Sequence, residues 1–316
     1  MKKLILIMCL FLSVNMPFFA YGNQELDYQK EYKKATTQND AEAQFRIGYM
    51  YEKGIEVEQS YTKAVQWYEK AVKQNNENAS VYLGSLYLNG LGVDQDLNKA
   101  KKLIEKGALN GNSSGEFYMG LFYEIMARNS QVKGIEANLN NDEINKNYVM
   151  ARKWYEKALK HGEPAAAGNL GVFYQDGKGV KPDEVKARKY YEQGAKGNAI
   201  VSKNNLANLY YLGKGGLKQD YIKGRKLDED AAKQGYVYSQ FNLGWLYFNG
   251  NGVKQDYQEA KKWFELAAEQ NSGEAQYYLG LIYQQGLGVE KDINTAKHYF
   301  KLSCQNIGDE DACQLQ

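Results

Sequence analysis

The stretch YVYSQFNLGWLYFNGNGVKQDYQEAKKWFELAAEQN, residues 236–271, decides the fold because the rest of the chain repeats its pattern. In its first half, small and apolar residues recur at helical spacing on one face: Ser239, Leu243, Gly244 and Tyr247. Gly250 and Gly252 then interrupt the pattern. In its second half, Asp256 precedes another such set: Ala260, Trp263, Phe264 and Ala267. The stretch therefore predicts two short helices joined by a glycine loop.

Seven copies of this unit follow one another. Aligning the chain on Leu-Gly-x-x-Tyr gives these glycine positions: Gly48, Gly84, Gly120, Gly171, Ala207, Gly244 and Gly280. Successive positions are separated by 36, 36, 51, 36, 37 and 36 residues. Such a period is typical of a solenoid, in which each helix pair packs on its neighbours. We therefore expect an all-α fold of seven helix-turn-helix repeats.

The second helix of each unit has its own start signal. Residues with a good N-cap side chain hold the position before it: Ser60, Asp96, Asn147, Asp183, Asp220, Asp256 and Asp292. Four residues later come small residues: Ala64, Ala100, Ala151, Ala187, Gly224, Ala260 and Ala296. Bulky pairs such as Trp67-Tyr68 then fill the space between the helices. Unit five, with Leu227-Asp228, fits this pattern least.

These positions match the signature A-x-x-x-L-G-x-x-Y-x-x-G-x-G-V-x-x-D-x-x-K-A-x-x-W-Y-x-K-A-A, most fully at residues 79–107 and 275–303. Over residues 41–303 the chain resembles the Sel1-like repeat family, which is related to the tetratricopeptide repeats. The resemblance implies antiparallel helix pairs stacked in a right-handed α-solenoid, with the first helices lining the concave face. Glu56 replaces the second loop glycine of unit one, and Ala207 replaces the Leu-Gly glycine of unit five.

The N-terminus reads as a secretory signal peptide over residues 1–22. Two lysines precede an apolar run from Leu4 to Val14, and Ala20-Tyr21-Gly22 forms a small-x-small cleavage site. Cys9 offers a lipoprotein alternative, although Met8 before it is not small. We therefore expect a periplasmic or secreted protein. No later apolar run approaches the roughly 20 residues of a membrane span.

The remaining segments lie at the ends and in unit three. Residues 23–40 read as a capping half-repeat, since Tyr32 and Ala35 precede Tyr68 and Ala71 by one period. Residues 304–316 form a C-terminal cap. Unit three is 15 residues too long, because its spacing is 51 rather than 36. The excess, about 127–147, shows no helical period and predicts a polar loop, either a tolerated insertion or a binding loop.

Cys304 and Cys313 are the two cysteines of the mature chain. In an exported protein, an even pair so close in sequence predicts a disulfide, with free thiols as the alternative. No third cysteine or histidine lies near them, so we expect no metal site and no cofactor. Loss of Lys2 and Lys3 leaves 38 of the 40 basic residues against 38 acidic ones. This balance gives no indication of nucleic-acid binding.

Two S-x-x-K matches, residues 60–63 and 130–133, raise the possibility of a β-lactam-binding hydrolase. Some cysteine-rich members of the resembled family are associated with β-lactam binding. However, Ser60 and Lys63 already hold repeat positions, and the S-D-N and K-T-G motifs of such enzymes are missing. We therefore expect no catalytic residues.

Unit six carries a distinctive aromatic stripe. Under tetratricopeptide geometry, the groove-facing positions lie six and three before, and one, four and five after, the Leu-Gly glycine. In unit six, aromatic side chains hold four of them: Tyr238, Phe241, Trp245 and Phe248. Neighbouring units add Tyr211, Tyr277 and Leu281. An exposed stripe of this kind predicts a partner-binding surface. Alternatively, the rings pack against adjacent first helices.

We therefore expect an exported, non-enzymatic scaffold, monomeric, that holds a peptide or a protein surface in its concave groove. Aromatic area would supply affinity, and groove-lining amides would supply specificity: Asn208, Asn249, Gln284 and Gln285. The resemblance also admits an immunity protein that blocks a toxin in the periplasm, or a secreted factor that acts on host proteins.

Overall fold

The computed structural model describes residues 27–137, 141–307 and 313–315, and this part of the chain contains fifteen α-helices and no strand. The helices are α1 (Tyr28–Thr37), α2 (Ala41–Lys53), α3 (Tyr61–Lys73), α4 (Glu77–Asn89), α5 (Leu97–Leu109), α6 (Ser113–Ala137), α7 (Asn141–Lys160), α8 (Ala165–Asp176), α9 (Glu184–Lys196), α10 (Ile200–Leu212), α11 (Tyr221–Lys233), α12 (Val237–Asn249), α13 (Tyr257–Glu269), α14 (Gly273–Gln285) and α15 (Ile293–Ile307).

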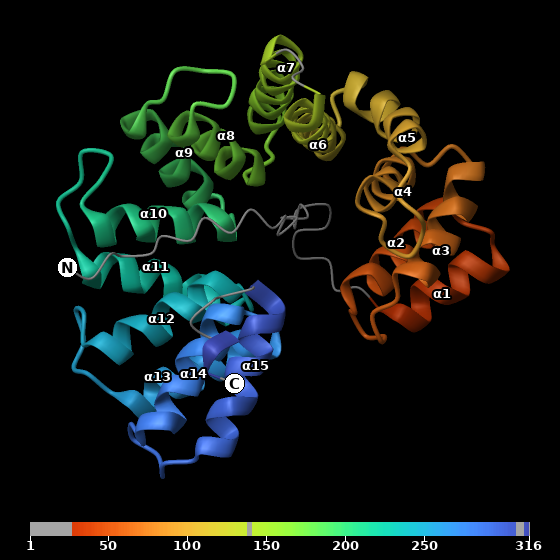
Figure 1. The fold of residues 1–316 in the computed structure, drawn as a ribbon. Coiled ribbons are helices and arrows are strands. Elements are labelled where there is room, and N and C mark those ends of the chain that lie inside the picture. Colours follow the sequence, from red (N-terminus) through yellow and green to blue (C-terminus); the bar gives the residue numbers. More distant parts are fainter. Residues whose placement is uncertain (1–26, 138–140, 308–312, 316) are drawn as a thin grey trace.

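The predicted all-α solenoid is confirmed. After α1, the helices form seven consecutive pairs, from α2 with α3 to α14 with α15. Each second helix packs on its own first helix, and all but the last, α15, also pack on the first helix of the next pair, as α3 does on α2 and α4. Figure 1 shows the pairs following one another in chain order around an arc.

The predicted N-caps start six of the seven second helices. Their side chains accept hydrogen bonds from backbone N–H groups of the first turn: Ser60, Asp96, Asp183, Asp220, Asp256 and Asp292. These bonds satisfy amide groups that would otherwise lack a partner. The prediction for unit three is wrong, because Asn147 lies inside α7.

The long unit three is helical where a loop was expected. Helix α6 continues to Ala137 and α7 begins at Asn141, so the extra residues lengthen both helices of the pair. Asparagine is the commonest residue of segment 127–147, and better helix formers such as Arg128, Glu136 and Lys146 lie among the asparagines without forming an apolar stripe. The search for an apolar period therefore missed it. The connecting residues 138–140 lie outside the described part of the chain.

The second loop glycine explains why unit one departs from the repeat. In unit two, Gly92 has φ +70°, and a Cβ there would lie 2.5 Å from the backbone carbonyl carbon of Tyr61 in the preceding unit. Unit one has only α1 before it. Its Glu56 adopts φ 56°, and the carboxylate accepts the backbone N–H of Tyr28 at 2.7 Å. Glu56 thus caps α1 at a place where later units need glycine.

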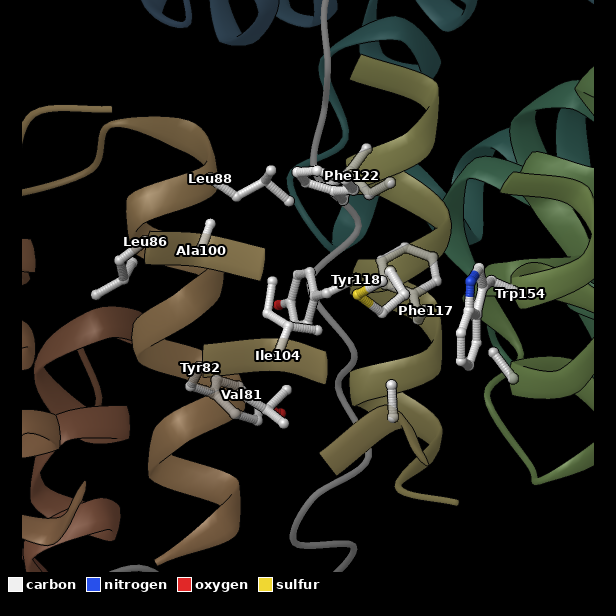
Figure 2. Packing of buried hydrophobic residues seen from close by; sticks show 14 of the residues in the cluster. Val81, Tyr82, Leu86, Leu88, Ala100, Ile104, Phe117, Tyr118, Phe122 and Trp154 are labelled. Atoms are coloured by element: carbon white, nitrogen blue, oxygen red, sulfur yellow. The ribbon is translucent and has the colours of Figure 1, made fainter. Parts of the chain in front are cut away.

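The core runs continuously through the first half of the solenoid. Figure 2 shows Tyr118 of α6 reaching toward Ile104 of α5, with Tyr82 of α4 nearby. The rings of Tyr82 and Tyr118 lie 6.2 Å apart, edge to face, and all three side chains are buried. Such contacts join one helix pair to the next.

The two ends of the solenoid differ. At the N-terminal end, α1 packs on α2 and buries Ala35; the predicted signal peptide lies outside the described residues. At the C-terminal end, a disulfide joins Cys304 of α15 to Cys313. Of the helices described, none combines the length and apolar character needed to cross a bilayer.

Candidate functional site

Each helix pair has one slot between its two helices. On the first helix, the Leu-Gly position forms the floor of the slot, and the residues three before and four after it form the walls. In unit one, Tyr68 fills the slot: its ring lies 5.7 Å from Phe45, and its hydroxyl donates to Glu52 at 2.7 Å. A Cβ on Gly48 would lie 2.6 Å from the Tyr68 ring, so the floor requires glycine.

The residue that fills the slot is fully buried in every unit: Tyr68, Ile104, Tyr155, Tyr191, Asp228, Phe264 and Phe300. In two further units, the wall residue four positions after the glycine accepts a hydrogen bond from the residue that fills the slot. Tyr155 donates to Glu124 at 3.1 Å, and Tyr191 donates to Gln175 at 3.0 Å. The position four after the glycine therefore faces the second helix of its own unit, although tetratricopeptide geometry suggested that it faces the groove.

Two residues of the aromatic stripe are walls of the unit-six slot. The rings of Phe241 and Phe248 lie 5.8 and 6.3 Å from Phe264, which fills it. Tyr278 of α14 closes the cluster, stacked on Phe264 at 5.1 Å and edge-on to Phe248 at 5.2 Å. Phe241 and Phe248 therefore follow the alternative prediction, in which the rings of the stripe pack against neighbouring helices.

Trp245 has a different position, one residue after the glycine. It packs against two clusters, one buried between α13 and α14 and the other among α10, α11 and α12, and its ring stays half-buried. Burial raises the pKa of Tyr278, and a hydrogen bond with Trp245 partly opposes this rise. Trp67, Trp154 and Trp263 lie on second helices, so Trp245 is the one tryptophan on a first helix.

The other predicted surface residues are placed unequally. Tyr211 is only 7% exposed and donates to Asp228 at 2.8 Å, so the expectation that it lies on the surface is wrong. Tyr238, Tyr277 and Leu281 are half-buried, and the Tyr277 ring lies 5.7 Å from Phe300 in the unit-seven slot. Trp245 is half-buried to the same class as these three residues, and it differs from them by packing on two hydrophobic clusters and by its hydrogen bond with Tyr278.

Unit five reverses the usual arrangement. Here the aromatic ring comes from the first helix, as Tyr211, and the glycine comes from the second helix, as Gly224. A Cβ on Gly224 would lie 2.3 Å from the Tyr211 ring. The small Asp228 then fills the slot above Ala207, so the floor tolerates a methyl group. This exchange explains both sequence departures of unit five.

Asp228 is the functional candidate that the sequence prediction missed. Four side chains donate to its carboxylate: Ser239 at 2.5 Å and Asn204 at 2.9 Å to Oδ1, and Tyr211 at 2.8 Å and Asn242 at 3.0 Å to Oδ2. Burial raises the pKa of Asp228 to about 6, and these hydrogen bonds limit the rise. The sequence carried a signal, because Leu227-Asp228 breaks the bulky-pair pattern beside Ala207.

In the first S-x-x-K match, Ser60 and Lys63 are engaged with other groups. Ser60 accepts the backbone N–H of Lys63 at 3.4 Å as the cap of α3, and the Lys63 ammonium lies over the Tyr51 ring. The side chain of Lys133 in the second match lies outside the described part. Among the described residues, no three His, Cys, Asp or Glu side chains gather closely enough to hold a metal ion.

A family model for the Sel1 repeat matches seven segments of the chain: residues 41–76, 78–112, 139–163, 164–198, 200–236, 237–272 and 273–306. The third match begins near the start of α7 and leaves out α6, the lengthened first helix of unit three. No curated protein matches the chain.

Solved structures of other repeat proteins resemble the fold. A Sel1 repeat protein from Oxalobacter formigenes is 30% identical with a TM-score of 0.57, over 77% of this chain and 100% of that one. A protective antigen with an SLR fold from uropathogenic Escherichia coli is 28% identical with a TM-score of 0.55. That match covers 91% of this chain but only 66% of the antigen. An immunity protein from Pseudomonas aeruginosa is 18% identical with a TM-score of 0.39, over 90% of this chain and 85% of that one.

Proposed function

Because the chain belongs to the Sel1 repeat family, we propose that it is an exported, non-enzymatic scaffold that binds a protein or peptide partner along the first helices of units five to seven. Repeats of this type mediate protein–protein interaction, and their stacked first helices supply a long, shaped surface. The partner would lie across α10, α12 and α14.

The half-buried Trp245 carries the proposal. The slot explains Phe241 and Phe248 as packing residues, but no slot requires a tryptophan one residue after the glycine. The equivalent residues of the neighbouring units are Asn208 and Leu281. A large, rigid and partly exposed ring supplies contact area with few rotors to freeze, which is why tryptophan is frequent at binding hot spots.

The non-enzymatic role and the export of the protein are supported by different observations. The engagement of Ser60 in capping and of Lys63 over the Tyr51 ring supports a non-enzymatic role, because it removes the first S-x-x-K match as a nucleophile and base pair. Export rests on the signal-peptide pattern of residues 1–22. The disulfide between Cys304 and Cys313 fits an oxidising compartment.

Capture with matched tryptophan variants tests the proposal. Wild type, Trp245→Ala and Trp263→Ala would be immobilised and exposed to an envelope extract of the producing cells. Trp263 is the control because it is also a half-buried tryptophan of unit six, but on the second helix. We expect a partner that wild type and Trp263→Ala retain and Trp245→Ala loses. Equal retention by all three proteins would refute a binding role for Trp245.

A further inference from the structure

A polar connection leads from the buried Asp228 to the proposed binding surface. Asn242 of α12 donates one N–H to Asp228 Oδ2 at 3.0 Å and the other to Asn208 Oδ1 of α10 at 3.1 Å. Asn208 holds the same position in unit five that Trp245 holds in unit six. The connection therefore ends on the neighbouring first helix, at the position equivalent to the candidate hot spot.

The carboxylate fixes the orientation of both amides. An ionised carboxylate can only accept, so Asn242 must turn its NH₂ group, not its carbonyl, toward Asp228. The second Asn242 N–H is then directed at Asn208, which must present its carbonyl. The Asn208 NH₂ group consequently points away from Asn242. Within the described part of the chain, no hydrogen bond uses this NH₂ group, and the side chain is half-buried.

Packing alone does not require a carboxylate in this slot. In units six and seven, Phe264 and Phe300 fill the same space and are fully buried. A buried carboxylate is unfavourable unless its neighbours satisfy it, and four donors from α10 and α12 do so here. The buried carboxylate thus holds the side-chain amides of its neighbours in one orientation.

We propose that Asp228 is a positioning residue for partner binding: through Asn242 it orients Asn208, whose NH₂ group donates to a main-chain carbonyl of an extended partner segment. The inference rests on the proposed binding function. A main-chain carbonyl fits because the donor is a neutral amide, which pairs with a neutral acceptor. Asn208 and Trp245 hold equivalent positions on consecutive first helices, and a hydrogen bond between Asn242 and Asn208 joins these helices at 3.1 Å. The recognised carbonyl should therefore lie a few residues along the extended partner from the side chain that contacts Trp245.

The test uses peptides selected on the wild-type protein from a random 12-residue phage library. The tightest peptide would be resynthesised with single main-chain amides replaced by esters, which weakens one carbonyl acceptor at a time. We expect one ester position to lower wild-type affinity about three- to tenfold. Asn208→Ala should lower the affinity of the unmodified peptide by a similar factor, and should no longer respond to that ester.

The positioning role of Asp228 has its own readout. At about pH 5 the Asp228 carboxyl group is protonated, and one of its four neighbours must accept this proton in a hydrogen bond. Asn208 should then be less firmly oriented. The effects of the ester and of Asn208→Ala on affinity should therefore depend less on each other in wild type. In Asp228→Asn the coupling should be weak at both pH 5 and pH 7.5. From α10, the titratable Tyr211 and the neutral Asn204 face Asp228, and the ion-paired Arg225 and Glu229 of α11 act on Tyr211. From α12, Ser239 and Asn242 face Asp228, and neither titrates in this range.

The outcomes separate the two proposals. If no selected peptide depends on Trp245, the proposed function fails. If binding depends on Trp245 but responds neither to any ester nor to Asn208→Ala, the function stands and this inference is overturned. If the ester coupling is the same in wild type and Asp228→Asn at both pH values, Asn208 is a contact residue and Asp228 does not position it. Circular dichroism of each variant confirms that the helices are intact.

Discussion

Acidification should stabilise this protein through Asp228. The pKa of this carboxyl group is about 6 in the fold, whereas its ordinary value is 3.8. The native state therefore holds the proton more tightly than the unfolded chain does, and the buried charge lowers stability at neutral pH. Stability lost at neutral pH returns as the pH falls through about 6, and the gain is complete below about 3.8.

The gap of about two pKa units corresponds to about 3 kcal/mol at neutral pH, since one unit is worth about 1.4 kcal/mol. Between about pH 7.5 and pH 4.5, roughly 2 kcal/mol of this should be recovered. Glu163 contributes with the same sign, because burial raises its pKa to about 7. A comparison with Asp228→Asn cancels this second contribution, because Glu163 is present in both proteins.

Urea unfolding of wild type and Asp228→Asn at the two pH values, followed by circular dichroism, measures the effect. The free energy of unfolding of wild type should rise by roughly 2 kcal/mol relative to the variant on acidification. A difference that stays constant, or that falls as the pH is lowered, would refute the assignment of a raised pKa to Asp228.

Three further predictions concern the scaffold. Gly244→Ala should lower the free energy of unfolding by about 1–3 kcal/mol, because the new Cβ would lie 2.6 Å from the Phe264 ring; thermal unfolding reports the loss. Gly92→Ala should lower the free energy of unfolding by more than about 2 kcal/mol, because Gly92 lies against the backbone of the preceding unit. Glu56→Ala, at the matched position of unit one, should lower it by about 1 kcal/mol through loss of one hydrogen bond. Equal losses in urea titrations of these two variants would contradict the loop argument. Cys304→Ser should cost about 2–3 kcal/mol by opening a loop with a sequence separation of 9, and dithiothreitol should produce the same loss in wild type but none in the variant.

Much of the fold was predictable because its packing residues recur. The period of Leu-Gly-x-x-Tyr identifies all seven helix pairs, and the acidic or hydroxyl N-caps identify the start of six second helices, because both patterns recur from unit to unit. The lengthened α6 and α7 were not predictable by the same method. Their extra turns are polar and asparagine-rich and carry no apolar stripe, so a search for apolar periodicity does not find them.

The site was harder to predict because positions near the Leu-Gly glycine on the first helix can face either the groove or the second helix of the same unit. The residue four after the glycine lies one turn further along the same face, so Glu52 meets Tyr68 and Tyr211 meets Asp228. Placing this position in the groove put Tyr211 and Phe248 on the wrong surface. Pairing the walls with the filling residue within each unit would have shown the correct direction. Trp245 could be singled out from sequence, because no packing pattern accounts for it.

The most direct measurement is the dissociation constant of the captured partner, or of a selected peptide, for wild type, Trp245→Ala and Trp263→Ala. Loss of a hot-spot tryptophan removes at least about 2 kcal/mol of binding free energy, which is roughly a thirtyfold weakening. We predict this weakening for Trp245→Ala and an unchanged constant for Trp263→Ala, with helical content retained in both variants. Equal affinity of wild type and Trp245→Ala would contradict the claim that partners bind along the first helices of units five to seven.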